Sequence, residues 1–269
     1  MDGPSIRRVG VVVKTTSSEA IELGRRLVTE LERLEVEPVP DSTSARVLDS
    51  SNGIPRTELA AAVDLVVVLG GDGTLLSVVR GDLGGTPILG INMGTLGFLT
   101  EHPQEKLFHM LHAALDGAVT VEERLRLDVS VLTPGREPIT RTALNDAVVN
   151  KSALARMLEL SVHIDDEFVS RYKADGLIVA TPTGSTGYAM AAGGPIVPPE
   201  LKNMLLIPLA PHLSLERAIV LSKGSMVRVK VHTDHTAILT VDGQFQVELA
   251  DGDWVQVVAS PCVGRFIRL

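Results

Sequence analysis

A glycine-rich loop, Gly70-Gly71-Asp72-Gly73-Thr74, carries residue types suited to phosphoryl chemistry. Its glycines permit positive φ and let backbone N–H groups approach phosphate oxygens, and the N-terminus of a following helix favours anions. Because a carboxylate repels phosphate, Asp72 fits such a loop if a metal ion screens it, or if it accepts a proton from a substrate hydroxyl. The alternative is a tight strand-to-helix turn in which Asp72 caps the helix.

The loop matches neither of two common nucleotide-binding motifs. No glycine in the chain is followed by lysine, so there is no Gly-Lys-Ser/Thr phosphate loop. The dinucleotide fingerprint also fails, since Gly71-Asp72-Gly73 has Leu76 where the third glycine belongs. A nucleotide that binds here must be held in another way.

A second loop, Thr181-Pro182-Thr183-Gly184-Ser185-Thr186-Gly187-Tyr188, follows a predicted buried strand over 176–180. Its four Ser and Thr hydroxyls and its backbone amides predict an array of donors for phosphate or ribose oxygens. A serine nucleophile is the alternative, but the spacing of the glycines around Ser185 is not that of a hydrolase elbow. A plain turn with solvated hydroxyls is the third interpretation.

The segments around these loops predict two kinds of sheet. Apolar runs at 9–13, 64–69 and 87–91 indicate buried strands, and helical patterns follow Ser17-Ser18 and cover 75–80 and 103–115. This alternation predicts a parallel sheet with covering helices. After Gly117 the apolar period becomes two, and the repeat predicts half-buried strands over 125–131, 158–164 and 227–231.

Two short polar pairs are typical of hairpin turns. Asp242-Gly243 lies between the runs 238–241 and 245–249, and Asp165-Asp166 follows the strand at 158–164. We therefore predict an α/β N-terminal domain with a parallel sheet over 1–118 and a mostly antiparallel, β-rich C-terminal domain over 119–269. Roughly the last 15–20 residues are expected to pack back on the first domain.

Composition excludes several classes of protein. The 269 residues are 45% hydrophobic, enough to bury a large core, and no apolar run approaches the roughly 20 residues that span a bilayer. A net charge of −8 and only eight aromatic residues (one Trp, two Tyr, five Phe) argue against nucleic acid as a partner. The single Cys262 excludes an intrachain disulfide. We expect a cytoplasmic protein that binds no membrane.

The two loops, together with Asn92-Met93-Gly94-Thr95-Leu96-Gly97-Phe98-Leu99 and Leu144-Asn145-Asp146, resemble the NAD kinase family from about residue 64 to residue 246. The resemblance implies transfer of the γ-phosphate of ATP to the 2′-hydroxyl of the adenosine ribose of NAD, which gives NADP and ADP. It also implies a nucleotide-binding α/β domain and an NAD-binding β-rich domain, with the active site in the cleft between them.

The resemblance also assigns residues. Asp72 matches the proton acceptor, Asn145 and Asp146 match a pair that holds ribose hydroxyls, and Asp175 matches a contact to the nicotinamide half. The remaining expected nucleotide contacts are Gly70, Gly71, Gly73, Thr74, Arg156, Lys173, Thr186, Gly187, Tyr188, Ala189, Met190, Ala191 and Gln244.

Four residues depart from the family pattern. Asp146 stands where glutamate is usual, and Gly187, Ala189 and Ala191 replace the commoner alanine and two serines. Each lost hydroxyl removes a possible hydrogen bond worth about 1 kcal/mol net. Affinity and donor preference are expected to shift, while the reaction class stays.

The implied reaction needs Mg²⁺ or Mn²⁺ with ATP, held mostly by phosphates and water, so no protein metal ligand is predicted. The resemblance implies a homodimer or homotetramer. Two alternatives are a lipid or small-molecule kinase that shares the Gly70–Thr74 loop and a non-catalytic NAD sensor. The sequence leaves open the phosphoryl donor, the choice between NAD and NADH, and allosteric control.

Overall fold

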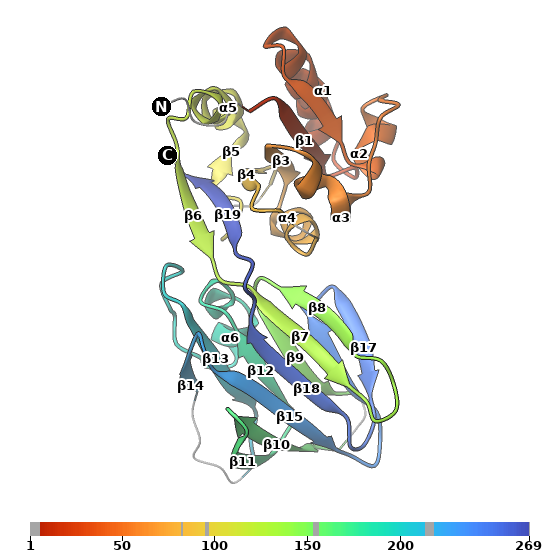
Figure 1. Ribbon diagram of the computed structural model, residues 1–269, viewed down its shortest axis with the longest axis vertical. Coiled ribbons are helices and arrows are strands. Elements are labelled where there is room, and N and C mark those ends of the chain that lie inside the picture. The colour runs from red at the N-terminus through yellow and green to blue at the C-terminus, as the bar shows by residue number, and fades with distance from the viewer. Residues whose placement is uncertain (1–5, 82, 95–96, 153–155, 213–217, 269) are drawn as a thin grey trace. The chain divides into compact units, whose positions relative to one another are not determined.

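The computed structural model describes residues 6–81, 83–94, 97–152, 156–212 and 218–268 (Figure 1). The chain divides into two compact units. One consists of Met1–Glu123 with Gly264–Leu269, and the other of Arg124–Val263. Each unit has its own sheets and its own apolar core, and each is described by itself below.

The first unit is built on a seven-stranded sheet in the order β2-β1-β3-β4-β19-β6, with β5 paired to β4. The pairs β1–β2, β1–β3, β3–β4, β4–β5 and β4–β19 are parallel, as predicted. β19 belongs to this sheet although it ends the chain, and its Phe266 and Ile267 are buried. The strands are β1 (Arg8–Val13), β2 (Glu37–Pro40), β3 (Leu65–Gly70), β4 (Pro87–Asn92), β5 (His102–Pro103), β6 (Thr120–Arg124) and β19 (Gly264–Arg268).

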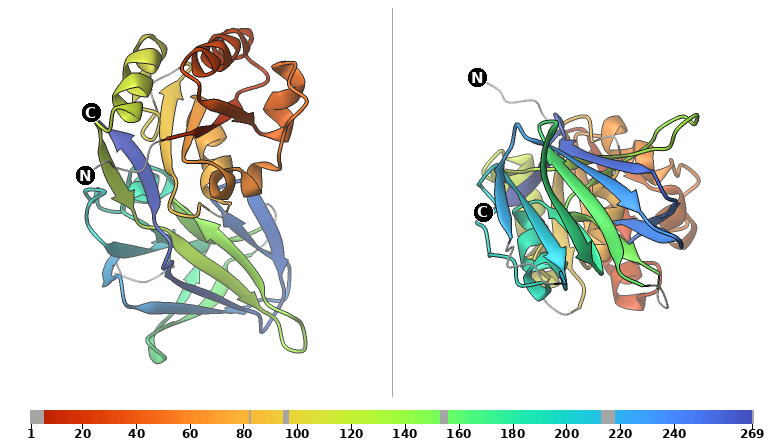
Figure 2. Two further views of the ribbon diagram at one scale, coloured as in Figure 1. Left: turned by 45° about the horizontal axis from the view of Figure 1, so that its top comes forward. Right: turned by 90° about the horizontal axis from the view of Figure 1, so that it is seen from below.

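Helices cover both faces of this sheet (Figure 2). Leu27 and Leu31 of α1 share one apolar cluster with Leu111 of α5 and with the side chains of β1 that point to that face. On the opposite face, Leu75 of α4 packs against Gly90 of β4. A Cβ added to Gly90 would stand 2.7 Å from the Cδ1 atom of Leu75. The helical segments are α1 (Ser18–Arg33), α2 (Ser42–Val47), α3 (Arg56–Leu59), η1 (Ala60–Ala62), α4 (Asp72–Val79), η2 (Gln104–Lys106) and α5 (Leu107–Leu115).

The second unit consists of two six-stranded sheets, β11-β10-β15-β18-β7-β8 and β14-β13-β12-β9-β16-β17. All their pairings are antiparallel, as predicted. The strands are β7 (Leu127–Leu132), β8 (Ile139–Ala143), β9 (Asp146–Lys151), β10 (Leu158–Ile164), β11 (Glu167–Ala174), β12 (Gly176–Ala180), β13 (Asn203–Leu209), β14 (Ile219–Ser222), β15 (Met226–His232), β16 (Ala237–Val241), β17 (Phe245–Leu249) and β18 (Trp254–Ala259).

The sheet that contains β12 is buried on both faces, which explains the continuous apolar run of that strand. Leu177 and Val179 join the core formed with the other sheet, whereas Ile178 and Ala180 join a second cluster. That second cluster also contains Ala189 and Val197. The loop after β12, with η3 (Thr183–Thr186) and α6 (Tyr188–Ala191), therefore packs on the outer face of this sheet.

Both predicted hairpin turns are present. Asp242 and Gly243 have φ of +49° and +62°, and Asp165 and Asp166 have φ of +53° and +67°. Two consecutive positive φ values are what a type I′ turn requires.

The predicted single strand over 125–131 is wrong in its extent. β6 ends at Arg124 in one sheet and β7 begins at Leu127 in another. Alternation of apolar and polar residues continues through the break because Leu125 and Leu127 are both buried. Arg126, which the pattern places on the solvent side, is buried as well, so the period of two predicts neither burial at the break nor which sheet the strand joins.

Within the described residues, no helix combines the length and the apolar character needed to cross a membrane.

An ion pair between Asp41 and Arg56 links the N-terminus of α2 to α4, the helix that follows the glycine loop. Asp41 is fully buried, accepts from the backbone N–H groups of Thr43 and Ser44, and pairs with Arg56 at 2.9 Å. Arg56 also donates to the hydroxyl of Ser77 in α4 at 2.9 Å. Asp41 thus caps α2 and orients Arg56, which hydrogen-bonds to α4.

We predict that Asp41→Ala lowers the free energy of unfolding by about 3 to 5 kcal/mol, because it leaves Arg56 without its carboxylate and α2 without its cap. Urea unfolding measures this. Glu37→Ala is the matched control, since its 3.1 Å pair with Arg8 is exposed and should contribute less than about 1 kcal/mol. Equal losses in the two variants would contradict the assignment.

Candidate functional site

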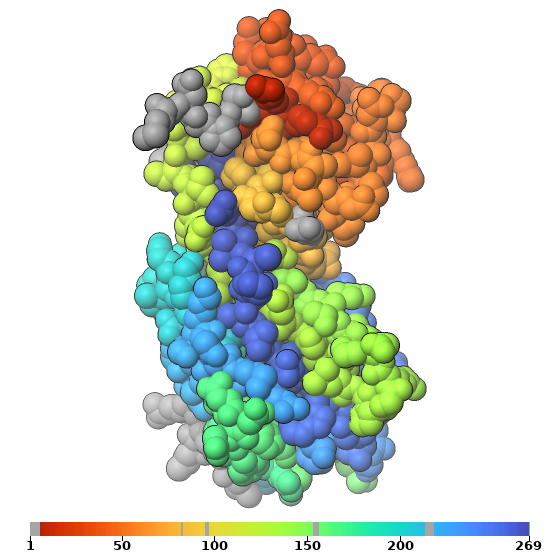
Figure 3. All heavy atoms as spheres, in the orientation of Figure 1, coloured from red at the N-terminus to blue at the C-terminus, as the bar shows by residue number. Residues whose placement is uncertain are grey.

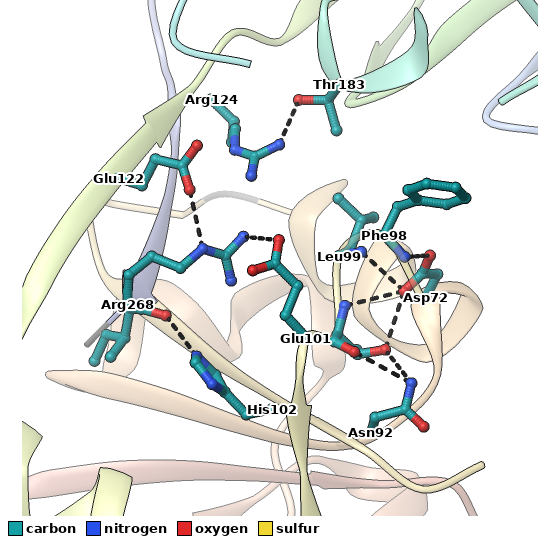
Figure 4. A network of polar contacts seen from close by, with 12 residues as sticks. Asp72, Asn92, Phe98, Leu99, Glu101, His102, Glu122, Arg124, Thr183 and Arg268 are labelled. Carbon is teal, nitrogen blue, oxygen red and sulfur yellow. Dashed lines mark hydrogen bonds and ion pairs between the residues drawn. The ribbon is translucent and has the colours of Figure 1, made fainter. Parts of the chain in front are cut away.

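Asp72 is the first residue of α4, and its carboxylate binds a loop rather than the helix. The backbone N–H of Phe98 donates to Oδ2 at 2.9 Å, and those of Leu99 and Thr100 donate to Oδ1 at 3.2 and 3.0 Å (Figure 4). The Thr100 hydroxyl adds a fourth bond to Oδ1 at 3.0 Å. The N-cap of α4 is Gly71, so the alternative in which Asp72 caps the helix is wrong.

The donors on Asp72 are themselves held in place. Asn92, the last residue of β4, donates through its Nδ2 to the Thr100 hydroxyl oxygen at 3.0 Å and to the Thr100 carbonyl at 3.2 Å. Because Asn92 occupies the acceptor side of that hydroxyl, the Thr100 proton is directed to Asp72. Among the described residues, Oδ1 of Asp72 accepts three hydrogen bonds and Oδ2 accepts one. Oδ2 therefore accepts fewer hydrogen bonds than Oδ1.

Gly97 gives the carboxylate its space. A Cβ on Gly97 would overlap Oδ1 of Asp72. The same motif contains Gly94, where a Cβ would meet nothing within 4 Å. Thr95 and Leu96 of this motif lie outside the described residues.

The rest of the Gly70–Thr74 loop is compact. Gly70 ends β3, and a Cβ on it would stand 2.6 Å from the Thr74 hydroxyl oxygen. The N–H of Thr74 donates to the carbonyl of Gly71 at 3.0 Å. Gly73 is exposed, and Asp72 is half-buried beside it. The first unit thus presents the carboxylate at a strand-to-helix turn, as the sequence indicates.

In the second unit, the segment Leu144–Asp146 is bound from two sides. The carboxylate of Asp242 accepts from the N–H groups of Leu144, Asn145 and Asp146 at 2.9, 2.8 and 3.2 Å. From the other side, Thr181 donates its hydroxyl to the Leu144 carbonyl at 2.5 Å and its N–H to the Asn145 carbonyl at 2.8 Å. The sequence analysis predicted Asn145 and Asp146 as contacts, but it did not predict that Asp242 and Thr181 bind their backbone.

The predicted array of hydroxyl donors is wrong for most of its members. Thr181 and Ser185 are fully buried; Thr181 binds Leu144, and Ser185 binds the backbone of Val197 at 3.0 and 3.3 Å. Thr186 donates to the carbonyl of Thr183 at 3.3 Å. The hydroxyls satisfy backbone groups that the tight turn leaves without a ladder partner. A nucleophilic role for Ser185 is excluded for the same reason.

A cavity of about 430 Å³ adjoins this turn within the second unit. It is lined by Asp175, Tyr188 and Ala191, three of the predicted contacts, and also by Asn150 and Lys151, which the sequence missed. Lys151 Nζ lies 2.6 Å from Asp175 Oδ1. The volume falls in the range of about 300–1,000 Å³ typical of small-molecule sites.

A larger cavity of about 560 Å³ in the same unit contains none of the predicted site residues. It adjoins the β7–β8 hairpin, which is exposed on the surface seen in Figure 3.

The other predicted contacts are spread over the second unit. Ala189 is fully buried in the apolar cluster on the outer face of the β12 sheet, so its side chain packs in the core. Seven predicted contacts of the second unit are exposed: Arg156, Lys173, Gly187, Tyr188, Met190, Ala191 and Gln244.

Asp146 has an unusual electrostatic environment. It is only 7% exposed, and burial raises the pKa of its carboxyl to about 7, with the negative charge of Asp242 as the second cause. Asp146 therefore carries its proton up to roughly neutral pH. Perturbed carboxyl groups of this kind concentrate at functional sites.

A metal ion finds few protein ligands here. In the described parts of the chain, no group of three or more His, Cys, Asp or Glu side chains is arranged to hold one. Asp72 is committed to backbone donors, and Asp175 is paired with Lys151. A divalent cation at this site would need its oxygen ligands from phosphate and water.

We predict that Gly97→Ala displaces the Asp72 carboxylate and lowers the free energy of unfolding by about 1 to 3 kcal/mol, the usual cost of overpacking. Chemical unfolding measures the change. Gly94→Ala is the control, since a Cβ there has open space, and it should change stability by less than about 1 kcal/mol. If Gly97→Ala were as stable as Gly94→Ala, the close approach would be refuted.

We predict a pH-dependent effect of Asp146→Asn. Between pH 4 and 7 the folded chain keeps the Asp146 proton while the unfolded chain loses it, so the free energy of unfolding falls as pH rises. The asparagine does not titrate, so the free energy of unfolding of the variant does not fall in this way. The stability of the variant minus that of the wild type should therefore be about 1 to 3 kcal/mol larger at pH 8 than at pH 5. Parallel urea titrations at the two pH values measure it, and a difference independent of pH would contradict the raised pKa.

Comparison with known proteins agrees with this arrangement. The family model of the ATP-NAD kinase N-terminal domain matches residues 9–119. The family model of the ATP-NAD kinase C-terminal domain matches residues 144–269. The chain is 43% identical over 255 residues to an NAD kinase of Trichlorobacter lovleyi, which covers 94% of this chain and 90% of that relative. It is 42% identical to an NAD kinase of Moorella thermoacetica, over 98% of this chain and 85% of that relative.

Solved structures are similar as well. Yeast NADH kinase complexed with NADH superimposes with a TM-score of 0.90 at 27% identity, covering 98% of this chain and 84% of the yeast chain. An NAD kinase from Archaeoglobus fulgidus in complex with ATP gives a TM-score of 0.79 at 33% identity, covering 97% and 93%. With both domain models matched and the fold shared, this chain is a kinase and belongs to the ATP-NAD kinase family.

Proposed function

We propose that this protein transfers the γ-phosphate of ATP to the 2′-hydroxyl of the adenosine ribose of NAD, with Asp72 as the proton acceptor. The observation that carries the proposal is the asymmetric use of the Asp72 carboxylate. Three donors fix Oδ1, whereas Oδ2 accepts only the N–H of Phe98 among the described residues. Oδ2 is oriented and still has a lone pair for a hydroxyl.

In the proposed step, the ribose oxygen attacks the γ-phosphorus as its proton passes to Oδ2 of Asp72. The bond between the oxygen and the γ-phosphorus forms, the bond from the γ-phosphorus to the β–γ bridging oxygen breaks, and ADP leaves with that electron pair. A ribose hydroxyl is a poor acid, so a positioned carboxylate contributes about 10²- to 10⁴-fold. The remaining rate enhancement is proposed to come from holding the two substrates in line.

The second unit supplies the NAD contacts in this proposal. Asn145 and Asp146 hold ribose hydroxyls, and Asp175 contacts the nicotinamide half in the cavity that Tyr188 and Ala191 also line. Lys151 lines the same cavity and forms an ion pair with Asp175. We also propose that Thr186, Gly187 and Met190 shape the pocket, and that Arg156, Lys173 and Gln244 reach the ligand from the surface.

ATP is proposed as the donor together with Mg²⁺ or Mn²⁺. The cation supplies charge neutralisation for the triphosphate. We assign no side chain to it, because Asp72 is proposed as the base and is bound to backbone donors. The Gly70–Thr74 loop is proposed to approach the phosphates with its backbone.

We further propose that the protein acts in the cytoplasm as a homodimer or homotetramer. Light scattering of the purified chain measures the oligomeric state.

We predict that Asp72→Asn lowers kcat at least about 100-fold and leaves NAD binding within a few-fold, because the amide cannot accept the proton. The assay incubates protein with ATP, Mg²⁺ and NAD and measures NADP with an NADP-specific dehydrogenase. Calorimetry reports NAD binding. NADH and polyphosphate are included as alternative acceptor and donor.

Asp116→Asn is the matched control, because Asp116 is an exposed carboxylate of the same unit at the end of α5. It should keep full turnover. Near-normal turnover of Asp72→Asn would remove Asp72 from the base role. NAD binding without NADP from any donor in the wild type would support the sensor alternative.

A further inference from the structure

We infer that Asp242 is a positioning residue for NAD recognition, which sets both the orientation of the Asn145–Asp146 pair and the protonation of the Asp146 side chain. The inference rests on the proposed function, in which this pair holds ribose hydroxyls. It starts from a residue that the sequence offered only as part of a turn.

The geometry of Asp242 exceeds what a turn needs. The type I′ turn requires positive φ at Asp242 and Gly243. The carboxylate instead crosses to a segment 96 to 98 residues away and accepts three successive N–H groups there. The N–H of Asp242 also donates to the Asp146 carbonyl at 3.0 Å. Four hydrogen bonds therefore tie the turn to the segment that carries Asn145 and Asp146.

The other side of the segment is also fixed. Thr181 binds the carbonyls of Leu144 and Asn145, and a Cβ on Gly184 would overlap the Asn145 carbonyl oxygen. The backbone from Leu144 to Asp146 thus has its donors on Asp242 and its carbonyls on Thr181 and Asp242. Such a segment holds its side chains in place before a ligand arrives, which reduces the entropy lost on binding.

Two buried carboxyl groups share this site, and only one has donors. Asp242 is 8% exposed and holds three N–H bonds, which stabilise a negative charge. Asp146 is 7% exposed, and no described group donates to its side chain. The proton therefore resides on Asp146, whose pKa is raised to about 7. Removing the charge of Asp242 should lower that pKa.

Among the described residues, the strands paired with β9 add no titratable group of their own, and the charged residue at the other end of β9 is Lys151. β9 pairs with β12 and β16, and neither of those strands contains a titratable residue within its bounds. η3 contains none either, and the cation that faces it is Arg124, which donates to the Thr183 hydroxyl at 3.4 Å. Asp242 is the described charged group that acts on the proton of Asp146.

Recognition of ribose follows from this pairing. An ionised carboxylate accepts the hydroxyl protons of ribose in charge-assisted hydrogen bonds, which a protonated carboxyl cannot do equally well. NAD binding should therefore release the Asp146 proton, and affinity should rise with pH through about 7. A group with this pKa gives about a tenfold gain in NAD affinity between pH 6 and pH 8.

The experiment compares the full-length wild type with Asp242→Asn. The asparagine Oδ1 can keep the bonds from Asn145 and Asp146, so the change removes the charge and disturbs the Leu144 bond. Carboxyl ¹³C NMR titration of the free protein follows Asp146, and calorimetry at pH 6 and pH 8 measures NAD affinity. We expect the Asp146 inflection to move to lower pH in Asp242→Asn, although burial keeps the pKa above its ordinary value, and the change in NAD affinity between the two pH values to fall below the roughly tenfold change of the wild type.

Two further variants sharpen the test. Asp146→Asn should abolish the pH dependence of NAD affinity. Asp165→Asn is the matched control, because Asp165 also has positive φ in a hairpin turn and accepts a backbone N–H, from Met226 at 2.8 Å. It should leave both readouts unchanged.

Uniformly weaker NAD binding of Asp242→Asn at both pH values, with the Asp146 inflection unmoved, would overturn the inference and leave Asp242 a structural residue. NAD affinity of the wild type that does not depend on pH would also overturn it. Failure of the proposed function is recognised separately, by the absence of NADP in the kinase assay.

Discussion

A carboxylate that accepts three successive backbone N–H groups from a distant loop organises each unit of this protein. In the first unit, Asp72 binds Phe98, Leu99 and Thr100. In the second, Asp242 binds Leu144, Asn145 and Asp146. Loop amides need acceptors when no strand pairs with them. One short side chain supplies all three acceptor contacts, and it thereby fixes the backbone of the loop.

The same device explains where glycine is required. Three amides can converge on one carboxylate only if the backbone approaches closely, and a Cβ at Gly97 would overlap Asp72. In the second unit, a Cβ at Gly184 would overlap the carbonyl of Asn145. Other glycines of the same loops, such as Gly71 and Gly94, have open space around them. The glycines of a loop thus divide into those that permit close packing and those with open space around them.

Local patterns predicted the elements well, and the contacts between them poorly. The apolar period predicted the parallel and antiparallel sheets, and Asp-Gly predicted the turn at Asp242, because those features depend on neighbours in the sequence. The hydrogen bonds of Asp242 and Thr181 to the 144–146 segment cross 36 to 98 residues, and no periodicity predicts such a contact. For the same reason the hydroxyls of Thr181 and Ser185 looked like ligands for a nucleotide, although they satisfy the backbone of their own unit.

The two units use their carboxyl groups differently, and the difference separates the proposed roles. Asp72 is half-buried among four donors and keeps Oδ2 for a further hydrogen. Asp146 is buried without donors beside a second carboxylate, so it holds a proton up to about pH 7. A proton acceptor must be ionised before the reaction, which Asp146 is not over that range. This difference is consistent with the proposal that Asp72 is the base, and with the proposal that Asn145 and Asp146 bind the ribose hydroxyls.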